Sequence, residues 1–297
     1  MDHLESLAFF VRIVEKRGIA AAGHEFGFSP ATATERLAAL EAHYDARLLH
    51  RTTRSLSLTE EGRVLLDGAR RLIDDARDLD ARIRLGIERL SGPIRLSAPH
   101  DLGMHRVAPA IDEFLAQHPE VHVDLILSDG YVDLVALGID LAVRFGALPD
   151  SGLRARKLGD NRRIVCASPA YLECHGTPQH PDELAAHNCL VMTFGGRVDR
   201  HWPFVIRGRR RRVEVSGNRS ASSGALVRRW CLDGLGIALK SEWDIRQQLD
   251  RGTLVELLEQ FAPRSDAALQ VIYAGGVAPS RRVRALLEHL VVAFDAP

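Results

Sequence analysis

The sequence predicts an α/β protein with an all-α N-terminal part, and three observations predict this division. Residues 1–90 show the three- and four-residue apolar spacing of amphipathic helices, interrupted by one short strand-like segment. Ser-Gly-Pro at 91–93 is typical of a boundary between domains. From residue 94 onward, short apolar strand patterns alternate with helical ones, as in a sheet that helices cover. A chain of 297 residues is long enough for two or more domains.

The composition argues against several classes of protein. The formal net charge is zero, so binding to nucleic acid would have to rest on a local basic surface. No apolar run approaches the roughly 18 residues that span a bilayer. The start, MDHLESLAFF, lacks the basic and apolar regions of a signal peptide. We therefore expect a cytoplasmic protein with no membrane partner.

The cysteines and histidines predict neither a metal site nor a cofactor. The four cysteines show no CxxC motif and no metal-type spacing: Cys166, Cys174, Cys189 and Cys231. Thirteen histidines are also spread without ligand spacing. Four reduced thiols are the simplest interpretation for a cytoplasmic protein. Redox control remains an alternative, with Cys166 and Cys189 as the pair to test.

The first residues predict a helix, a short second helix and a turn. Apolar residues recur at three- and four-residue steps, as on one helix face: Leu4, Leu7, Val11 and Val14. A second helix is expected from about residue 20 to 26. Gly27 follows it, and glycine readily adopts the left-handed backbone that ends a helix.

A third helix is predicted over residues 30–43. Ser29 is a good N-cap, and Pro30 suits the first helical position, where its missing N–H costs nothing. The buried face is expected to contain Ala33, Leu37 and Leu40. At 100° per residue the opposite face contains Ala31, Thr34, Glu35 and Ala38. That face is small and polar, as a surface that approaches base edges must be, although an ordinary amphipathic helix is the alternative.

Residues 48–59, LLHRTTRSLSLT, predict a basic hairpin. Arg51 and Arg54 flank the expected turn, and guanidinium groups pair with phosphate oxygens or enter a narrow minor groove. Thr59, followed by Glu-Glu-Gly, predicts the N-cap of a further helix. The hairpin favours a winged helix-turn-helix domain over residues 1–59, with its third helix in a DNA major groove.

The segments AAGHEFGFSPATATERLAALE and LLHRTTRSLSLTEEG, with most of the remaining chain, resemble the LysR-type transcriptional regulators. The resemblance implies a DNA-binding regulator rather than an enzyme, with a palindromic double-stranded operator as its partner. The expected DNA contacts are Ser29, Pro30, Ala31, Thr34, Glu35, Arg36, Arg51 and Arg54.

Two positions depart from the family pattern. The family usually has Ser or Thr at the position of Ala20, where it caps the second helix, so we expect a loss of about 1 kcal/mol of local stability. It commonly has Arg or Lys at the position of Glu35. A carboxylate repels phosphates but accepts a hydrogen bond from cytosine N4. An unusual operator sequence is therefore expected, with the usual mode of docking.

Residues 60–90 predict a long linker helix with a heptad seam. The apolar positions step by 4, 3, 4, 3, 4 along Leu65, Ala69, Leu72, Ala76, Leu79 and Ile83. Such a seam requires a partner, and the resemblance implies antiparallel pairing of two linker helices through Leu65, Leu72 and Leu79. A dimer or tetramer would present two recognition helices to a palindrome.

The remainder of the chain predicts a sheet covered by helices. The signals are strands at 94–98, 121–128, 140–146 and 269–274, and helices to about 117, at 131–138 and at 280–294. The order of strands and helices predicts a parallel sheet with ligand sites at the strand ends. GLGIALKS at 234–241 lacks the glycine of a phosphate loop at Leu239, and a buried strand is the better interpretation.

For residues 91–297 the resemblance implies a two-lobed, type 2 periplasmic-binding-protein-like effector domain. The chain would cross between lobes near Asn161 and Pro263. This gives lobe I at 91–161 and 264–297, and lobe II at 162–263. A small, polar or anionic effector would bind between the lobes, and RNA polymerase is a further partner if the protein is an activator.

Carried over by position, the residues expected to line the cleft are Pro99, His100, Asp101, Ser128, Phe145, Met192, Thr193, Ser220, Ser222 and Ser223. Serines before the helix at about 223 can expose backbone N–H groups, which suit a carboxylate. His100 and Asp101 stand where the family more often has small or apolar residues, and they would select the effector unless His100 is simply a surface residue. An enzyme or binding protein on the same two lobes is the other alternative, although no nucleophile–base pattern supports it.

Overall fold

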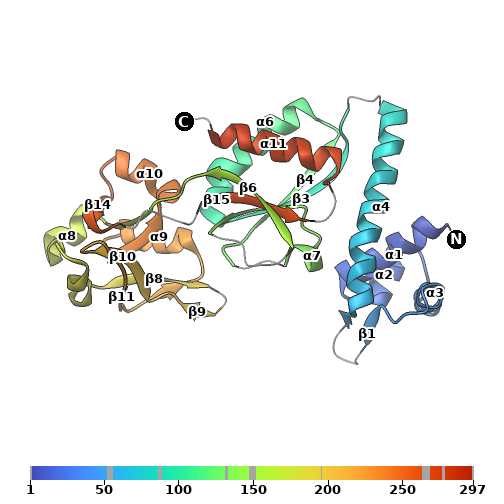
Figure 1. Ribbon diagram of the computed structural model, residues 1–297, viewed down its shortest axis with the longest axis horizontal. Coiled ribbons are helices and arrows are strands. Elements are labelled where there is room, and N and C mark those ends of the chain that lie inside the picture. The colour runs from blue at the N-terminus through green and yellow to red at the C-terminus, as the bar shows by residue number, and fades with distance from the viewer. Residues whose placement is uncertain are drawn as a thin grey trace.

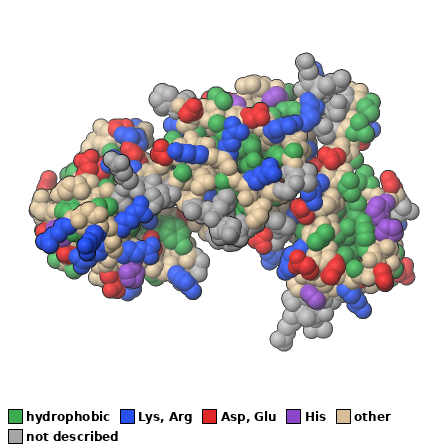
Figure 2. Space-filling model, viewed as in Figure 1, with side chains coloured by type: hydrophobic (Ala, Val, Ile, Leu, Met, Phe, Trp, Pro, Cys, Tyr) green, Lys and Arg blue, Asp and Glu red, His purple; other side chains and the backbone are tan. Residues whose placement is uncertain are grey.

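The computed structural model confirms an N-terminal part of helices and one hairpin, followed by an α/β remainder. Figure 1 shows three parts in a row: the N-terminal domain with the long helix α4, a first lobe beside α4, and a second lobe at the far end. In Figure 2, acidic and basic side chains are interspersed over all three parts, in keeping with zero net charge. Among the described residues no helix is long and apolar enough to cross a membrane. The described residues are 2–51, 56–85, 89–130, 133–146, 152–194, 196–262, 268–275 and 278–295.

The N-terminal domain packs its helices around one apolar core. Phe10 and Ile13 of the first helix are fully buried with Leu37 of the third. Ala33, Leu37 and Leu40 form the buried face of the third helix, as predicted. The elements are α1 (His3–Lys16), α2 (Ile19–Glu25), α3 (Pro30–His43), β1 (Leu49–Arg51) and β2 (Leu56–Leu58).

The turn between α2 and α3 confirms the predicted signals. Gly27 has a φ of +70°. The Ser29 hydroxyl accepts a hydrogen bond from the Thr32 N–H at 3.2 Å, and Pro30 begins α3. A Cβ on Gly23 would lie 2.8 Å from the Cβ of Ala33, so the two helices can approach only because both residues are small.

Position 20 is not the N-cap of α2, so the prediction that Ala20 replaces a capping residue was wrong. The helix begins at Ile19, its N-cap is Gly18, and no side chain accepts a hydrogen bond from its first turn. Ala20 is therefore an exposed residue inside the helix, where alanine is the best helix former. The expected loss of local stability does not apply at this position.

The hairpin and the start of α4 (Glu60–Leu85) are joined tightly. Strands β1 and β2 pair antiparallel. The side chain of Arg51 and the whole of Arg54 lie outside the described residues. The Thr59 hydroxyl accepts from the Gly62 N–H at 2.9 Å, which confirms the predicted N-cap. A Cβ on Gly62 would lie 2.0 Å from the carbonyl oxygen of Leu48, so this contact between helix and hairpin requires glycine.

The linker helix α4 differs from its prediction in the use of its seam. Its described part reaches Leu85, residues 86–88 lie outside the described residues, and Leu90 is buried in the core of the first lobe. Ala69 is fully buried in the N-terminal core, and Leu65 packs against that core, because the first turns of α4 lie on α1. Further along, Leu72 and Leu79 are 54% and 55% exposed. The apolar seam is therefore divided between an internal contact and an open face.

Lobe I is built on a mixed five-stranded sheet, in the order β4-β3-β5-β15-β6. The first three strands are parallel, as predicted, but β15 and β6 run antiparallel to their neighbours. The parallel arrangement predicted for the strands of residues 94–146 is therefore confirmed, and β15 alone is reversed, because the chain returns from lobe II in the opposite direction. The strands are β3 (Gly92–Ala98), β4 (Val121–Leu127), β5 (Leu141–Phe145), β6 (Leu153–Gly159) and β15 (Leu269–Ala274). The helical segments are α5 (His100–Leu102), a π-helical turn (Gly103–Val107), α6 (Ala108–Gln117), α7 (Leu134–Leu137) and α11 (Arg281–Asp295).

Lobe II has its own sheet, in the order β12-β8-β13-β7-β14, with β9 beside β8 and a separate hairpin of β10 and β11. All residues of β13 are buried, which confirms that GLGIALKS runs into a core strand. The strands are β7 (Arg163–Ala167), β8 (Cys189–Phe194), β9 (Arg197–Val198), β10 (His201–Ile206), β11 (Arg209–Glu214), β12 (Ser220–Ala221), β13 (Ile237–Ser241) and β14 (Val255–Leu257). The helices are α8 (Pro169–His175), α9 (Gly224–Leu232) and α10 (Glu242–Asp250), with 3-10 turns at Pro181–Ala186 and Glu259–Phe261.

The chain passes from lobe I to lobe II between β6 and β7, at Asn161. Asn161 is 4% exposed, and its side-chain oxygen accepts from the Ser241 hydroxyl at 2.6 Å. This bond anchors the crossing segment to lobe II. The return to lobe I lies between the last 3-10 turn and β15, and Pro263 of this segment lies outside the described residues.

Candidate functional site

The outward face of α3 is open to solvent. Ala31, Thr34, Glu35 and Ala38 are exposed, while the opposite face is buried. The Thr34 hydroxyl donates to the Pro30 carbonyl at 2.9 Å, so it lies against the helix. Glu35 forms no hydrogen bond or ion pair within the described part of the chain. Its carboxylate is therefore available to a partner outside the protein.

One other predicted DNA contact, Arg36, is held by packing. The guanidinium of Arg36 lies 4.1 Å from the centre of the Phe28 ring, a cation–π contact that fixes its stem. Phe28 in turn meets Phe9 edge-on at 5.3 Å. Ser29 and Pro30 are exposed at the start of the helix. The end of α3 that would enter a groove is thus anchored to the core behind it.

A cavity of about 450 Å³ lies between the two lobes. Pro99, Asp101, Ser128 and Phe145 of lobe I line it, with Met192 of lobe II, as predicted. The other lining residues are Asp129, Gly130, Leu134, Arg144, Gly146, Leu153, Asn161, Arg163, Phe194, Gly224, Leu239, Lys240, Ser241, Asp244, Gln270 and Ile272. This volume is in the ordinary range for small-molecule sites.

The other predicted cleft residues lie beside the cavity rather than on its wall. His100 is exposed and Thr193 pairs with β9. Ser220 belongs to β12, and Ser222 is exposed. The Ser223 hydroxyl accepts from the Leu226 N–H at 3.3 Å and so caps α9. The carboxylate site expected at these serines is already used by the chain itself.

Asp129 of lobe I occupies the N-terminal end of α9 in lobe II. Its Oδ2 accepts from the Gly224 N–H at 2.8 Å, across the cleft. Its Oδ1 accepts from the His100 N–H at 2.7 Å, within lobe I. A carboxylate at a helix N-terminus is favoured by the free N–H groups and the helix dipole. Asp129 therefore joins the lobes where an anionic ligand was expected.

Asp101 forms a second link between the lobes. Its carboxylate lies 3.1 Å from Arg228 and 3.8 Å from Lys240, both in lobe II. Lys240 is 4% exposed, donates to the Gly224 carbonyl at 2.9 Å and lies 3.1 Å from Asp244. Burial raises the pKa of the Asp101 carboxyl, against the opposing effect of Lys240 and Arg228. A buried carboxylate of this kind remains charged only while its cations stay in place.

Sequence reasoning missed most of the charged lining. Asp129 directly follows the predicted Ser128, and Arg144 lies in a strand that is otherwise apolar. Lys240 was visible as a lysine inside a strand predicted to be buried, and lysine is almost never fully buried unless it is paired. These charges interrupt apolar strands, and that interruption was the available signal.

Cys166 and Cys189, the pair named for the redox alternative, are both free and buried. Strand β13 lies between β7, which contains Cys166, and β8, which contains Cys189. Two strand spacings place their Cα atoms roughly 10 Å apart, beyond the limit of about 7 Å for a disulfide. Burial raises the pKa of Cys189 to about 12, and a hydrogen bond with Cys231 together with burial holds the pKa of Cys166 well above its ordinary value. Both thiols are therefore poor nucleophiles. In the described ranges no cluster of His, Cys, Asp or Glu is suited to a metal ion.

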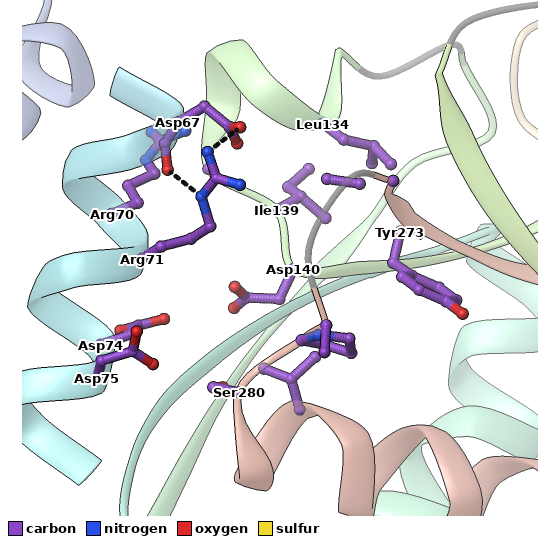
Figure 3. Close-up of a pocket in the computed structure, with 16 residues that line it drawn as sticks. Asp67, Arg70, Arg71, Asp74, Asp75, Leu134, Ile139, Asp140, Tyr273 and Ser280 are labelled. Atoms are coloured by element: carbon purple, nitrogen blue, oxygen red, sulfur yellow. Dashed lines mark hydrogen bonds and ion pairs between the residues drawn. The ribbon is translucent and has the colours of Figure 1, made fainter. Parts of the chain in front are cut away.

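A second, smaller cavity of about 140 Å³ lies between α4 and lobe I. Figure 3 shows Asp67, Arg70, Arg71, Asp74 and Asp75 on the α4 side, facing Asp140, Tyr273 and Ser280 of lobe I. The α4 side of this junction is charged, whereas the lobe I side is mainly apolar apart from Asp140, Tyr273 and Ser280.

Arg282 connects the two sides of the junction between α4 and lobe I. It is 3% exposed and lies 2.6 Å from the Asp74 carboxylate of α4. The same side chain donates to the Pro93 carbonyl at 2.8 Å, at the start of lobe I. Beside it, burial raises the pKa of Asp140 to about 6, although the Arg95 N–H donates to this carboxylate at 2.7 Å. Lobe I and the linker helix are thereby fastened to one another within a single chain.

Two family models match the chain. The model described as "Bacterial regulatory helix-turn-helix protein, lysR family" matches residues 4–63, and "LysR substrate binding domain" matches residues 88–295. These ranges correspond to the N-terminal domain and to the two lobes. The exposed face of α3 and the cleft therefore lie in different family modules of the same chain.

Known relatives extend over nearly the whole chain. The HTH-type transcriptional regulator DmlR of Escherichia coli (strain K12) is 35% identical over 292 residues, covering 97% of this chain and 93% of the relative. The regulator CrgA of Neisseria meningitidis serogroup C (strain 8013) is 34% identical over 287 residues, covering 97% and 95%. The solved structure of CrgA from Neisseria meningitidis superposes with a TM-score of 0.64 at 32% identity and covers 98% of each chain. The chain described above is therefore a LysR-type transcriptional regulator, a member of the LysR family with a helix-turn-helix domain and an effector domain.

Proposed function

We propose that this regulator binds a small polar or anionic effector in the cleft between its lobes and, as a dimer or tetramer, binds a palindromic operator. The protein would act in the cytoplasm, without enzymatic activity of its own, and would contact RNA polymerase if it activates transcription. The proposal combines the family identity with two separate surfaces, the exposed face of α3 and the charged cleft.

The DNA-facing half of the proposal rests on the accessible side of α3. Ala31, Thr34 and Glu35 would face base edges, because they are exposed opposite the buried face of the helix. The start of the helix and the stacked arginine would contact the backbone through Ser29, Pro30 and Arg36. Arg51 and Arg54 of the hairpin are proposed to hold phosphates on either side of the groove.

Self-association is proposed to use the open half of the α4 seam. Leu72, Leu79 and Ile83 are exposed by 54%, 55% and 76%, and they recur at heptad spacing. A second linker helix would remove this apolar row from water. Leu65 is proposed to contribute at the edge only, since it already packs against the N-terminal core.

One observation supports the proposal that a ligand regulates DNA binding: lobe I both lines the cleft and contacts the linker helix. Asp101 and Asp129 reach across the cleft from lobe I. Arg282 of lobe I holds Asp74 of α4. A ligand that separates or closes the lobes would therefore move lobe II relative to lobe I and α4, and in the oligomer this movement would change the spacing of the DNA-binding domains. The recognition helix itself would be unchanged.

A mobility-shift assay with the DNA upstream of this protein's own gene tests the proposal. We expect the full-length protein to bind at nanomolar to micromolar concentration, and small metabolites that raise its thermal stability to alter that binding. Failure to bind this DNA, or any operator selected from a random library, would contradict the DNA-binding half. A ligand that binds without any effect on the operator complex would contradict the regulatory half.

A further inference from the structure

The charged side chains on the cleft wall differ in whether they have a partner. Lys240 lies 3.1 Å from Asp244, and Arg163 lies 3.6 Å from Asp199. Arg144 has no such contact. Among the described residues that line the cavity, Arg144 is the one cation that forms no ion pair.

Arg144 is held in place by neutral acceptors. It lies in β5, opposite Gln270 in the register with β15. One terminal nitrogen donates to the Val143 carbonyl and the other to the Ser97 hydroxyl, each at 2.7 Å. Burial lowers the pKa of Arg144, and Asp129 opposes this effect only through longer-range attraction. The guanidinium is thus oriented and partly desolvated, but it is not neutralised by contact.

A partly buried, uncompensated guanidinium is costly, and a ligand carboxylate would relieve this cost. The planar fork of arginine matches a carboxylate, and charge-assisted hydrogen bonds are about twice as strong as neutral ones. The rest of the wall supplies mainly apolar surface. Its large apolar members are Leu134, Phe145, Leu153, Met192, Phe194, Leu239 and Ile272.

The acidic residues of the cleft limit the total charge of a ligand. Asp101, Asp129 and Asp244 line the same cavity as Arg144. A second negative charge on the ligand would meet these carboxylates in surroundings of low polarity, where repulsion is stronger than in water. For a single negative charge, the attraction of Arg144 offsets that repulsion, whereas a second charge has no further unpaired cation among the described lining residues.

We propose that Arg144 binds the carboxylate of the effector and that the effector is a monocarboxylate with an apolar body. The inference rests on the proposed function, because it names the ligand chemistry of the same cleft. Arg144 then determines ligand specificity, because it favours binding of a carboxylate over a neutral molecule of the same shape.

Calorimetric titration of the full-length protein with benzoate and hexanoate, each compared with its primary amide, tests the inference. Phenyl phosphate serves as the dianionic comparison. We expect the wild type to bind a carboxylate in preference to its amide. Arg144→Gln should weaken carboxylate binding roughly 10- to 100-fold, the range for loss of a hydrogen-bonded charge, and Arg144→Lys should weaken it less. Arg156→Gln removes an exposed arginine from β6 of the same sheet and should leave affinity unchanged.

Three results would overturn the inference: equal affinity for a carboxylate and its amide, undiminished carboxylate binding by Arg144→Gln, or no saturable binding of either carboxylate at millimolar concentration. Tighter binding of phenyl phosphate than of benzoate would overturn the inference that the effector carries a single negative charge. Glutamine can still donate to Ser97, and thermal unfolding checks that the variant is folded; Arg144→Lys decides the matter if it is not. Failure of the proposed function would give a different result. The wild type would then bind no operator, or a carboxylate whose binding depends on Arg144 would leave operator binding unchanged.

Discussion

Replacing Asp140 with Asn tests the electrostatics of the junction between lobe I and the linker helix. Burial raises the pKa of this carboxyl from its ordinary 3.8 to about 6. The Arg95 N–H, Arg70 and Arg282 favour the charged form, and Asp74 opposes it. Desolvation exceeds all of these favourable contacts. The neutral amide of Asn should therefore be better tolerated at neutral pH, while its oxygen can still accept from Arg95.

Proton linkage gives the direction and the size of the change in folding stability with pH. A raised folded-state pKa means that the folded protein binds more protons than the unfolded chain between pH 3.8 and about 6. Stability therefore falls as the pH rises through this window. At about 1.36 kcal/mol per pH unit, the difference between 3.8 and about 6 corresponds to at most roughly 3 kcal/mol, lost in full above about pH 7. Asp140→Asn should recover this stability at neutral pH and gain nothing near pH 4.

Thermal unfolding between about pH 4 and pH 8 measures the effect. The Tm of Asp140→Asn should exceed that of the wild type by several degrees near pH 8 and converge with it near pH 4. Asp112→Asn, at an exposed carboxylate of α6, should show no such divergence. A Tm difference that is the same at every pH, or a variant that is less stable than the wild type near pH 8, would refute the reasoning.

Three further changes test other parts of the chain. Gly62→Ala should destabilise the N-terminal domain by about 1–3 kcal/mol or more and weaken operator binding, because its Cβ would lie 2.0 Å from the Leu48 carbonyl oxygen; an unchanged Tm would contradict this. The double mutant Leu72→Asp with Leu79→Asp should be monomeric by light scattering. If it stays oligomeric, the main contact between subunits lies outside α4. Glu35→Arg should change one base pair in each operator half-site, worth roughly 1–3 kcal/mol; library selection that returns the wild-type consensus would show that Glu35 reads no base.

The helix-turn-helix could be predicted from sequence because its signals are local. Ser29 caps α3 through a residue three positions away, and Thr59 caps α4 in the same way. Gly27 ends the turn with its own backbone conformation. The Ala20 prediction failed because family position was used in place of such a signal, and the cap lies two residues earlier at Gly18.

The α4 seam shows the limit of periodicity. Heptad spacing predicts that one face of a helix is covered, but it does not say by what. Ala69 is covered by the N-terminal core, whereas Leu72 and Leu79 are left open. Both groups lie in one regular pattern, so only the position of α1 against α4 separates them.

The position of the cleft was predicted, but the charged groups that line it were not. The family resemblance supplied Pro99, Ser128 and Phe145, which lie at the ends of sheet strands and line the cavity. The serines before α9 were expected to bind an anion, yet Asp129 from the other lobe already accepts from the Gly224 N–H. These partners are 95 residues apart, and no local pattern links them.

By itself, the sequence determined the helices, the caps of α3 and α4, the basic hairpin, the order of strands and the family to which the chain belongs. These features depend on hydrogen bonds and apolar spacing within a few residues. Only the tertiary structure decided which charges meet. Arg282 finds Asp74 at a separation of 208 residues, and Arg144 is left without an ion-pair partner among the described lining residues of the cleft. Such pairings depend on how separately formed elements pack, because an ion pair exists only where packing brings two side chains within a few ångströms and excludes water between them.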